Sequence, residues 1–244
     1  FNLIHIRVIV PYFMIKTFLI LISIQTFLFA SQQVILVVSS DFNTSGASME
    51  CYEDDKKVFE TFHVNIGKNG LGWGLGELIL TKKSGEPFKK EGDKKAPAGV
   101  FKLTNIFGYK EKRNFHMPYL FASKNLICVD DVVSEYYNQI IQMPDNKPKS
   151  FEYMKRGDNQ YELGIVVAHN KSGIKQKGSC IFMHVEKFDN APTVGCTSMK
   201  LEELKQITSW LDETKNPILI QIPKSSSKEI LTLFPQLRAS KLLN

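Results

Sequence analysis

The sequence lacks the features that identify several large classes of protein. Nothing in its 244 residues repeats at a fixed period, and no low-complexity tract is long, so nothing indicates a solenoid or a fibrous architecture. It also has no helix-turn-helix pattern, no zinc-finger spacing and no aromatic–basic ribonucleoprotein motif. The net charge of +6 allows attraction to an anionic polymer, but without such a motif we predict no nucleic-acid partner.

The composition is that of a globular protein with a substantial core, 43% hydrophobic and 23% charged. Its positive charge is spread along the chain, with one local cluster of lysines in "KKSGEPFKKEGDKK" (82–95). We interpret this cluster as a solvated loop, because runs of like charge usually face water.

The first thirty residues differ from the rest. "MIKTFLILISIQTFLFA" begins at Met14, carries Lys16 as a positive end and is apolar-rich from Phe18 to Ala30. This run is shorter than the ~20 residues of a membrane span and is typical of a secretory signal peptide. We therefore expect residues 1–30 to be upstream sequence plus a signal peptide, with Met14 as the start. We expect residues 31–244 to be one domain in the periplasm or cell envelope, without stable membrane insertion once the signal is cleaved. An uncleaved anchor is the alternative.

Only four cysteines occur, at positions 51, 128, 180 and 196. In an exported protein thiols tend to pair, and four cysteines allow two disulfides in three connectivities. Their scattered spacing is unlike that of a disulfide scaffold, and the sequence leaves the pairing open. A thiol kept free in an oxidising compartment needs a functional reason.

Apolar patterning predicts a β-rich domain with a few helices. The expected helices cover 130–141, where the apolar spacing is helical, a segment from Leu201 to Leu211, and 226–234, where Ser226 and Glu229 form a capping-box pattern. A glycine-rich turn is expected at 67–76, and a polar loop joins two strands into a hairpin before His184. The expected strands are 33–40, 57–67, 96–109, 161–170, 179–185 and 217–223.

His184 and Cys196 stand out in "SCIFMHVEKFDNAPTVGCTSMK" (179–200). A zinc site is disfavoured, because Cys180 and His184 lie ~13 Å apart on an extended strand and one ion with bonds of ~2.3 Å cannot reach both. We predict neither a metal nor a cofactor. The plain structural interpretation is a hydrogen-bonded histidine and a small buried cysteine.

The alternative interpretation is that Cys196 is a nucleophile and His184 its base. Cys196 lies just before an expected helix, with Ser198 as a possible N-cap, and the helix N-terminus would favour a thiolate. His184 can accept the thiol proton and return it to a leaving amine. The turn of Gly195, Cys196 and Thr197 can direct backbone N–H groups at an oxyanion.

These residues also resemble a known family. His184, followed after eleven residues by Gly195-Cys196-Thr197-Ser198 and preceded at 193 by Thr, is similar to the signature of the L,D-transpeptidase (YkuD) family. The segments 89–103, 128–141, 164–170 and 181–199 resemble one exported bacterial branch of it. The resemblance implies a β-sandwich catalytic domain and an acyl-enzyme on Cys196. It also implies peptidoglycan stem peptides as partners, with release of D-alanine and formation of a 3→3 crosslink.

Some features depart from the family pattern. Val194 stands where many members have a second His, Ser198 stands where they have Arg or Asn, and the His-to-Cys interval is short. The acceptor is therefore open: an L,D-carboxypeptidase would pass the same acyl group to water. A non-catalytic envelope protein that binds peptidoglycan is a further alternative, and it would leave Cys196 unreactive or in a disulfide. The oligomeric state is left open.

Weaker candidates complete the predicted site. Thr193 and Ser198 join Gly195 and Thr197 as possible oxyanion or substrate-binding residues. A last group could shape a groove for the stem peptide: Trp73, Glu91, Asp93 and His169. The plain alternative is that these residues serve in packing, turn formation or structural hydrogen bonding.

Overall fold

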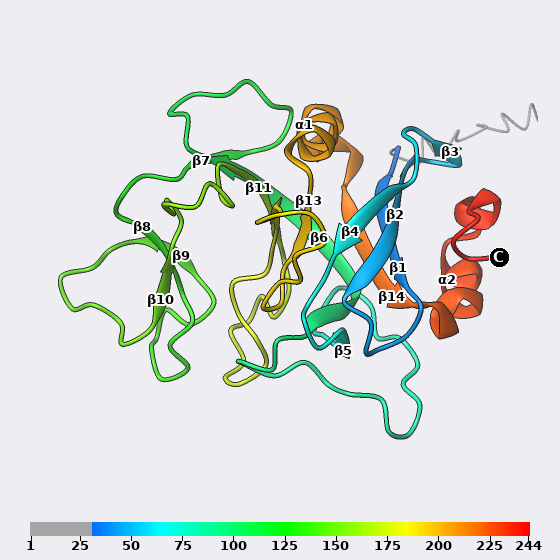
Figure 1. Ribbon diagram of the computed structural model, residues 1–244, viewed down its shortest axis with the longest axis horizontal. Coiled ribbons are helices and arrows are strands. Elements are labelled where there is room, and N and C mark those ends of the chain that lie inside the picture. The colour runs from blue at the N-terminus through cyan, green and yellow to red at the C-terminus, as the bar shows by residue number, and fades with distance from the viewer. Residues whose placement is uncertain (1–30) are drawn as a thin grey trace, which may run out of the picture.

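The computed structural model describes residues 31–244, and the expected signal peptide lies outside these residues. The chain is mainly β, with short helices towards its C-terminal end (Figure 1). The helices are α1 (Leu201–Trp210), α2 (Ser227–Leu233) and the 3-10 turns η1 (Glu213–Lys215), η2 (Lys224–Ser226) and η3 (Pro235–Ala239). The strands are β1 (Gln33–Ser39), β2 (Gly46–Glu53), β3 (Lys56–Lys57), β4 (Phe62–Asn65), β5 (Leu71–Trp73), β6 (Ala96–Gly108), β7 (Tyr119–Phe121), β8 (Leu126–Val129), β9 (Ile140–Gln142), β10 (Phe151–Tyr153), β11 (Leu163–Val167), β12 (Phe182–Val185), β13 (Thr197–Met199) and β14 (Ile218–Pro223).

The main sheet closes on itself. Its order runs β1-β14-β6-β11-β12-β13-β4-β2, and β2 pairs back onto β1. The sequence-based expectation of a sandwich is therefore wrong in this respect: the domain is a barrel. The reason is that β1 pairs with β14 on one side and β2 on the other, which leaves no open edge between two separate sheets.

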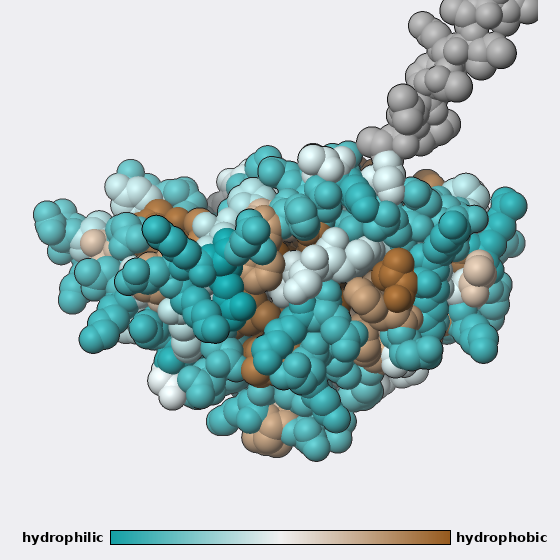
Figure 2. Space-filling view, turned by 90° about the horizontal axis from the view of Figure 1, so that it is seen from above, coloured by the Kyte–Doolittle hydropathy of each residue, from teal (hydrophilic) through white to brown (hydrophobic). Residues whose placement is uncertain are grey.

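The continuous apolar run of β1 follows from this position. All seven of its residues are buried, because its inner face lines the barrel core while α2 and the C-terminal turns lie beside its outer face (Figure 1). Ile230 of α2 and Leu237 of η3 belong to the same buried cluster as Val34 and Leu36. A strand covered on both faces does not alternate. From above, most of the visible surface is hydrophilic, with smaller apolar areas between (Figure 2).

A second, three-stranded sheet has the order β10-β8-β9 and lies beside the barrel, on the side of β11 (Figure 1). It contains part of the segment 130–141, and the helix expected there is wrong. The chain instead forms turns and enters β9 at Ile140. The Asp131 carboxylate accepts hydrogen bonds from the N–H groups of Val133 and Lys149, and Asn138 adopts a positive φ of 64°. Such side-chain-to-backbone bonds compete with a helix.

Other expectations are confirmed or corrected locally. The strands at 96–109 and 217–223 are found as β6 and β14, and β11 and β12 pair antiparallel, with Gly164 opposite His184. The expected strand 57–67 is interrupted between β3 and β4. The expected capping box at Ser226 does not form: the Ser226 side chain makes no capping hydrogen bond, and Glu229 accepts hydrogen bonds from the N–H and hydroxyl of Thr81.

The helix α1 forms as expected, with Leu204 and Ile207 buried against the barrel. Its N-cap is Lys200 rather than Ser198, and the Lys200 N–H donates to the Glu203 carboxylate at 3.1 Å. In the described part of the chain, no helix is long and apolar enough to cross a membrane.

Candidate active site

Cys196 lies at the end of a tight turn that leads directly into β13. The N–H of Gly195 donates to the Thr193 hydroxyl at 3.1 Å, and that hydroxyl donates to the Cys196 carbonyl oxygen at 2.6 Å. Gly195 has a φ of 151°, which disfavours any residue with a side chain. The helix α1 begins only at Leu201, so the expectation that Cys196 lies at a helix N-terminus is wrong: a strand comes between them.

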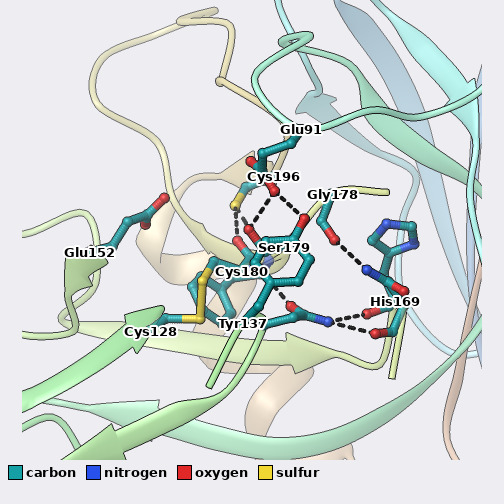
Figure 3. Close-up of a disulfide and its surroundings, with 12 residues drawn as sticks. Glu91, Cys128, Tyr137, Glu152, His169, Gly178, Ser179, Cys180 and Cys196 are labelled. Atoms are coloured by element: carbon teal, nitrogen blue, oxygen red, sulfur yellow. Dashed lines mark hydrogen bonds between the residues drawn. A yellow bond between two sulfur atoms is a disulfide. The ribbon is translucent and has the colours of Figure 1, made fainter. Parts of the chain in front are cut away.

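The thiol of Cys196 contacts two backbone polar groups within a buried apolar cluster that includes Phe182 and Tyr161. Its Sγ accepts a hydrogen bond from the Phe182 N–H at 3.3 Å and contacts the Cys180 carbonyl oxygen at 3.6 Å (Figure 3). The residue is 5% exposed. Burial raises the pKa of the Cys196 thiol to about 12, and the nearby Glu152 carboxylate adds to the shift. At neutral pH the resting site therefore holds a protonated thiol.

His184 lies on β12, the strand next to β13, and pairs in register with Ser198. Its Nδ1 is 2.8 Å from the Val185 carbonyl oxygen. Because a carbonyl only accepts, Nδ1 carries the proton and Nε2 keeps its lone pair. Burial lowers the pKa of His184 to about 4, so the imidazole is neutral. Within residues 31–244, no hydrogen bond joins His184 to Cys196.

Tyr161 connects the surroundings of these two residues. Its ring packs edge-on against both the His184 and Phe182 rings, at centroid distances of 5.2 and 5.5 Å. Its hydroxyl donates to the Glu152 carboxylate at 2.6 Å. Burial raises the pKa of Glu152. The histidine, the thiol and this carboxylate are thus grouped around one aromatic side chain.

A cavity of about 280 Å³ opens at Cys196. Its walls combine the Cys196 turn with charged groups from distant segments. Val194, at its rim, is 71% exposed, and the Oδ1 atom of Asp130 is buried without a hydrogen-bond partner in the described part of the chain. The remaining lining residues are Lys89, Glu91, Gly92, Lys94, Glu152, Ser179, Cys180, Ile181 and Gly195.

One of the weaker sequence candidates lines this cavity, and a second pairs with a lining residue. Glu91 lines it and accepts hydrogen bonds from the hydroxyls of Tyr137 and Ser179, the latter at 2.7 Å (Figure 3). Asp93 pairs with Lys89 at 2.6 Å. Lys89 is 4% exposed, so the interpretation of its whole cluster as a solvated loop is wrong at this residue.

The other candidates point elsewhere. Trp73 donates its indole N–H to Glu86 at 2.7 Å and lines a separate cavity. His169 accepts from the Leu75 N–H at 3.2 Å and contacts the Lys177 carbonyl oxygen at 2.9 Å. Thr197 donates its hydroxyl to Gln221 at 2.7 Å. These contacts hold the barrel and its loops together and do not reach Cys196.

Ser198 is the exception among the candidates on β13. Its hydroxyl oxygen is buried and has no hydrogen-bond partner among residues 31–244. It lies two residues after Cys196, on β13, and pairs in register with His184 of β12.

A disulfide joins Cys128 of β8 to Cys180 (Figure 3), and Cys51 and Cys196 are free and buried. The bond connects the small sheet to the residue whose carbonyl contacts the Cys196 thiol. Glu152 pairs in register with Cys128. The disulfide therefore holds one wall of the cavity. Four scattered cysteines gave no signal for this choice of partners.

Several residues of the site were missed in the sequence. Lys89 was hidden in a lysine cluster, and it forms its ion pair with Asp93 across a turn rather than along a helix. Asp130, Glu152 and Tyr161 lie in segments whose local pattern says nothing about the cavity. Within residues 31–244, no group of three or more His, Cys, Asp or Glu side chains is arranged to hold a metal ion.

The fold and the site together define a closed β-barrel with a free cysteine in a small, highly charged cavity. The family model of YkuD, the L,D-transpeptidase catalytic domain, matches residues 33–220. The chain belongs to this family, whose L,D-transpeptidase-type activity is directed at peptidoglycan. No match was found among curated proteins or among solved structures.

Proposed function

We propose that this chain is an exported cysteine acyltransferase that forms 3→3 crosslinks between peptidoglycan stem peptides through an acyl-enzyme on Cys196. The observation that carries the proposal is the free thiol of Cys196 in the wall of a charged cavity, within a chain that belongs to the YkuD family. The same observation favours a functional cysteine over a purely structural one, because Cys196 lines the cavity although it also packs in a buried apolar cluster with Phe182.

The reaction uses neutral partners. The His184 imidazole, protonated at Nδ1 by its contact with the Val185 carbonyl, has Nε2 available as the base. The buried thiol loses its proton as it attacks the acyl carbon, so no standing thiolate is required. His184 then returns the proton to the departing amine of D-alanine. The acceptor amine of a second stem peptide completes the transfer.

Reaching the thiol requires a small movement. Because His184 and Cys196 share no hydrogen bond in the resting site, we propose that substrate entry brings the two together. Catalytic hydrogen bonds commonly tighten only when substrate binds.

The disulfide supports the proposed export. Cys128 and Cys180 form a bond of the kind that persists in oxidising compartments such as the periplasm. The cavity wall that it holds would be less fixed in a reducing cytoplasm.

The test incubates the purified protein with tetrapeptide muropeptides and follows products by mass spectrometry. We expect crosslinked dimers that disappear in a Cys196→Ala variant and persist in a matched Cys51→Ala variant. Free tripeptides without dimers would assign the carboxypeptidase reaction instead. If neither product forms while the protein still binds sacculi, the enzyme proposal is wrong.

A further inference from the structure

Lys89 reaches the Cys196 turn from a distant segment. It follows β5 along the chain, and its aliphatic stem passes over Gly178, where an added methyl group would lie 2.9 Å from Lys89 Cε. Its Nζ atom would lie 3.8 Å from a methyl group added at Gly195. Gly178 therefore leaves the room for the lysine stem, and the ammonium ends within contact distance of the residue that precedes the nucleophile.

The ammonium of Lys89 has one donor left over. It donates to Asp93 Oδ1 at 2.6 Å and to the Lys90 carbonyl oxygen at 2.8 Å. An ammonium has three N–H groups, and the third finds no acceptor among residues 31–244. Asp93 is itself fixed by the N–H groups of Lys90 and Lys95 at 2.6 and 2.9 Å. The charge is thus held in place at the edge of the cavity that Cys196 lines.

The backbone supplies fewer donors than the sequence suggested. The Gly195 N–H is already taken by the Thr193 hydroxyl, whereas the N–H of Cys196 has no acceptor in the described part of the chain. The cavity also contains Glu91, Asp130 and Glu152. Carboxylates disfavour a developing oxyanion, so a nearby cation has most to contribute here.

We propose that Lys89 is a catalytic residue of this site, donating its free N–H to the acyl oxygen of the donor peptide. This rests on the proposed acyl transfer. As Cys196 Sγ bonds to the acyl carbon, the thiol proton passes to His184 Nε2 and the carbonyl π pair moves onto oxygen. Lys89 and the Cys196 N–H hold that oxyanion. The intermediate then re-forms the C=O bond, the C–N bond breaks, and His184 protonates the leaving amine.

The experiment compares a Lys89→Met variant with Lys90→Met, which removes a neighbouring exposed lysine side chain. Three rates are measured: turnover of the tetrapeptide, acylation of Cys196 by a carbapenem, and alkylation of Cys196 by iodoacetamide. Only the first two create an oxyanion. For Lys89→Met we expect kcat and the acylation rate to fall about 100- to 1,000-fold. We expect alkylation to change less than about tenfold, and Lys90→Met to behave as wild type.

The outcomes separate this proposal from the proposed function. Equal losses in acylation and alkylation would show that Lys89 acts on the thiol, and a rise in KM with unchanged kcat would show that it binds a substrate carboxylate. Either result overturns the proposal. If the wild-type protein does not turn over the tetrapeptide, the proposed function fails. The role of Lys89 is then still tested by comparing the rate of carbapenem acylation of Cys196 with its rate of alkylation. A Lys89→Gln/Asp93→Asn double variant, which leaves no unpaired carboxylate at position 93, must repeat the pattern.

Discussion

The molecule contains two free cysteines in different surroundings. Cys51 lies on β2 inside the barrel, opposite Ile35 of β1, in the main apolar cluster. Cys196 directly precedes β13 and belongs to the second buried cluster, against the Phe182 N–H and a charged cavity. Burial is the largest cause of a raised pKa at both thiols, so burial alone does not distinguish a nucleophile from a core residue.

The difference lies in what each thiol can reach. Around Cys51 the neighbours are apolar strands, and a substrate has no way to approach. Around Cys196 a glycine turn and a buried lysine line a space of about 280 Å³, and a neutral histidine lies on the adjacent strand β12. Reactivity in this protein is therefore decided by access and by partners that act during the reaction, rather than by a thiolate already present at rest.

The largest expected effect comes from replacing each of the two free cysteines in turn. Replacing Cys196 by Ala should lower tetrapeptide turnover by at least about 10⁴-fold, because the covalent route is lost. Replacing Cys51 by Ala should leave turnover unchanged and lower only the stability. Steady-state kinetics and thermal unfolding of both variants check this; similar activity in the two would mean that Cys196 is not the nucleophile.

The disulfide holds the surroundings of Cys196 in place but not those of Cys51. A Cys128→Ser/Cys180→Ser variant opens a loop with a sequence separation of 52 residues. The chain-entropy relation gives a loss of about 4 kcal/mol in the free energy of unfolding, measurable by urea titration. Because the bond holds one cavity wall, Cys196 should also be alkylated faster in the variant, whereas Cys51 should be unchanged. Equal acceleration at both thiols would indicate general loosening of the fold.

Acid should destabilise the protein through its two buried histidines. Burial lowers the pKa values of His169 and His184 to about 4, below their ordinary value, so the unfolded chain binds more protons between these values. The contribution of these two histidines to the free energy of unfolding is fully present above about pH 6.5. It is lost as the pH drops towards 4, by up to about 3 kcal/mol per histidine. Urea titrations across this range check the slope. A His184→Gln variant should flatten it, and replacement of the exposed His63 should not.

The smallest effect concerns the thiol itself. Because the pKa of Cys196 is about 12, its alkylation by iodoacetamide should rise about tenfold per pH unit from pH 7 to 10, following the thiolate fraction. Peptide mass spectrometry follows each cysteine separately. A plateau near neutral pH would instead reveal a thiolate already present at rest and contradict the neutral-pair mechanism.

The sequence allowed β1, β6, β11, β12 and β14 to be predicted, because apolar runs such as that of β1 are local signals, whereas β2 and β13 were missed. It also indicated the family through the segment that contains His184 and Cys196. The helix expected at 130–141 failed because its apolar spacing does not report the competing bonds of Asp131. The sandwich failed because closure depends on β1 meeting β2 and β14 together, which no local pattern records.

By itself, then, the sequence determined a β-rich domain with a histidine at the end of an apolar strand and, after eleven intervening residues, a cysteine that follows a glycine. Only the tertiary structure decided what surrounds them. Lys89, Glu152 and the Cys128–Cys180 bond come from segments far apart in the chain, and their approach to Cys196 depends on packing between elements. Side-chain periodicity is set by the backbone of one segment, whereas the charge and access of a cavity are set by several segments together.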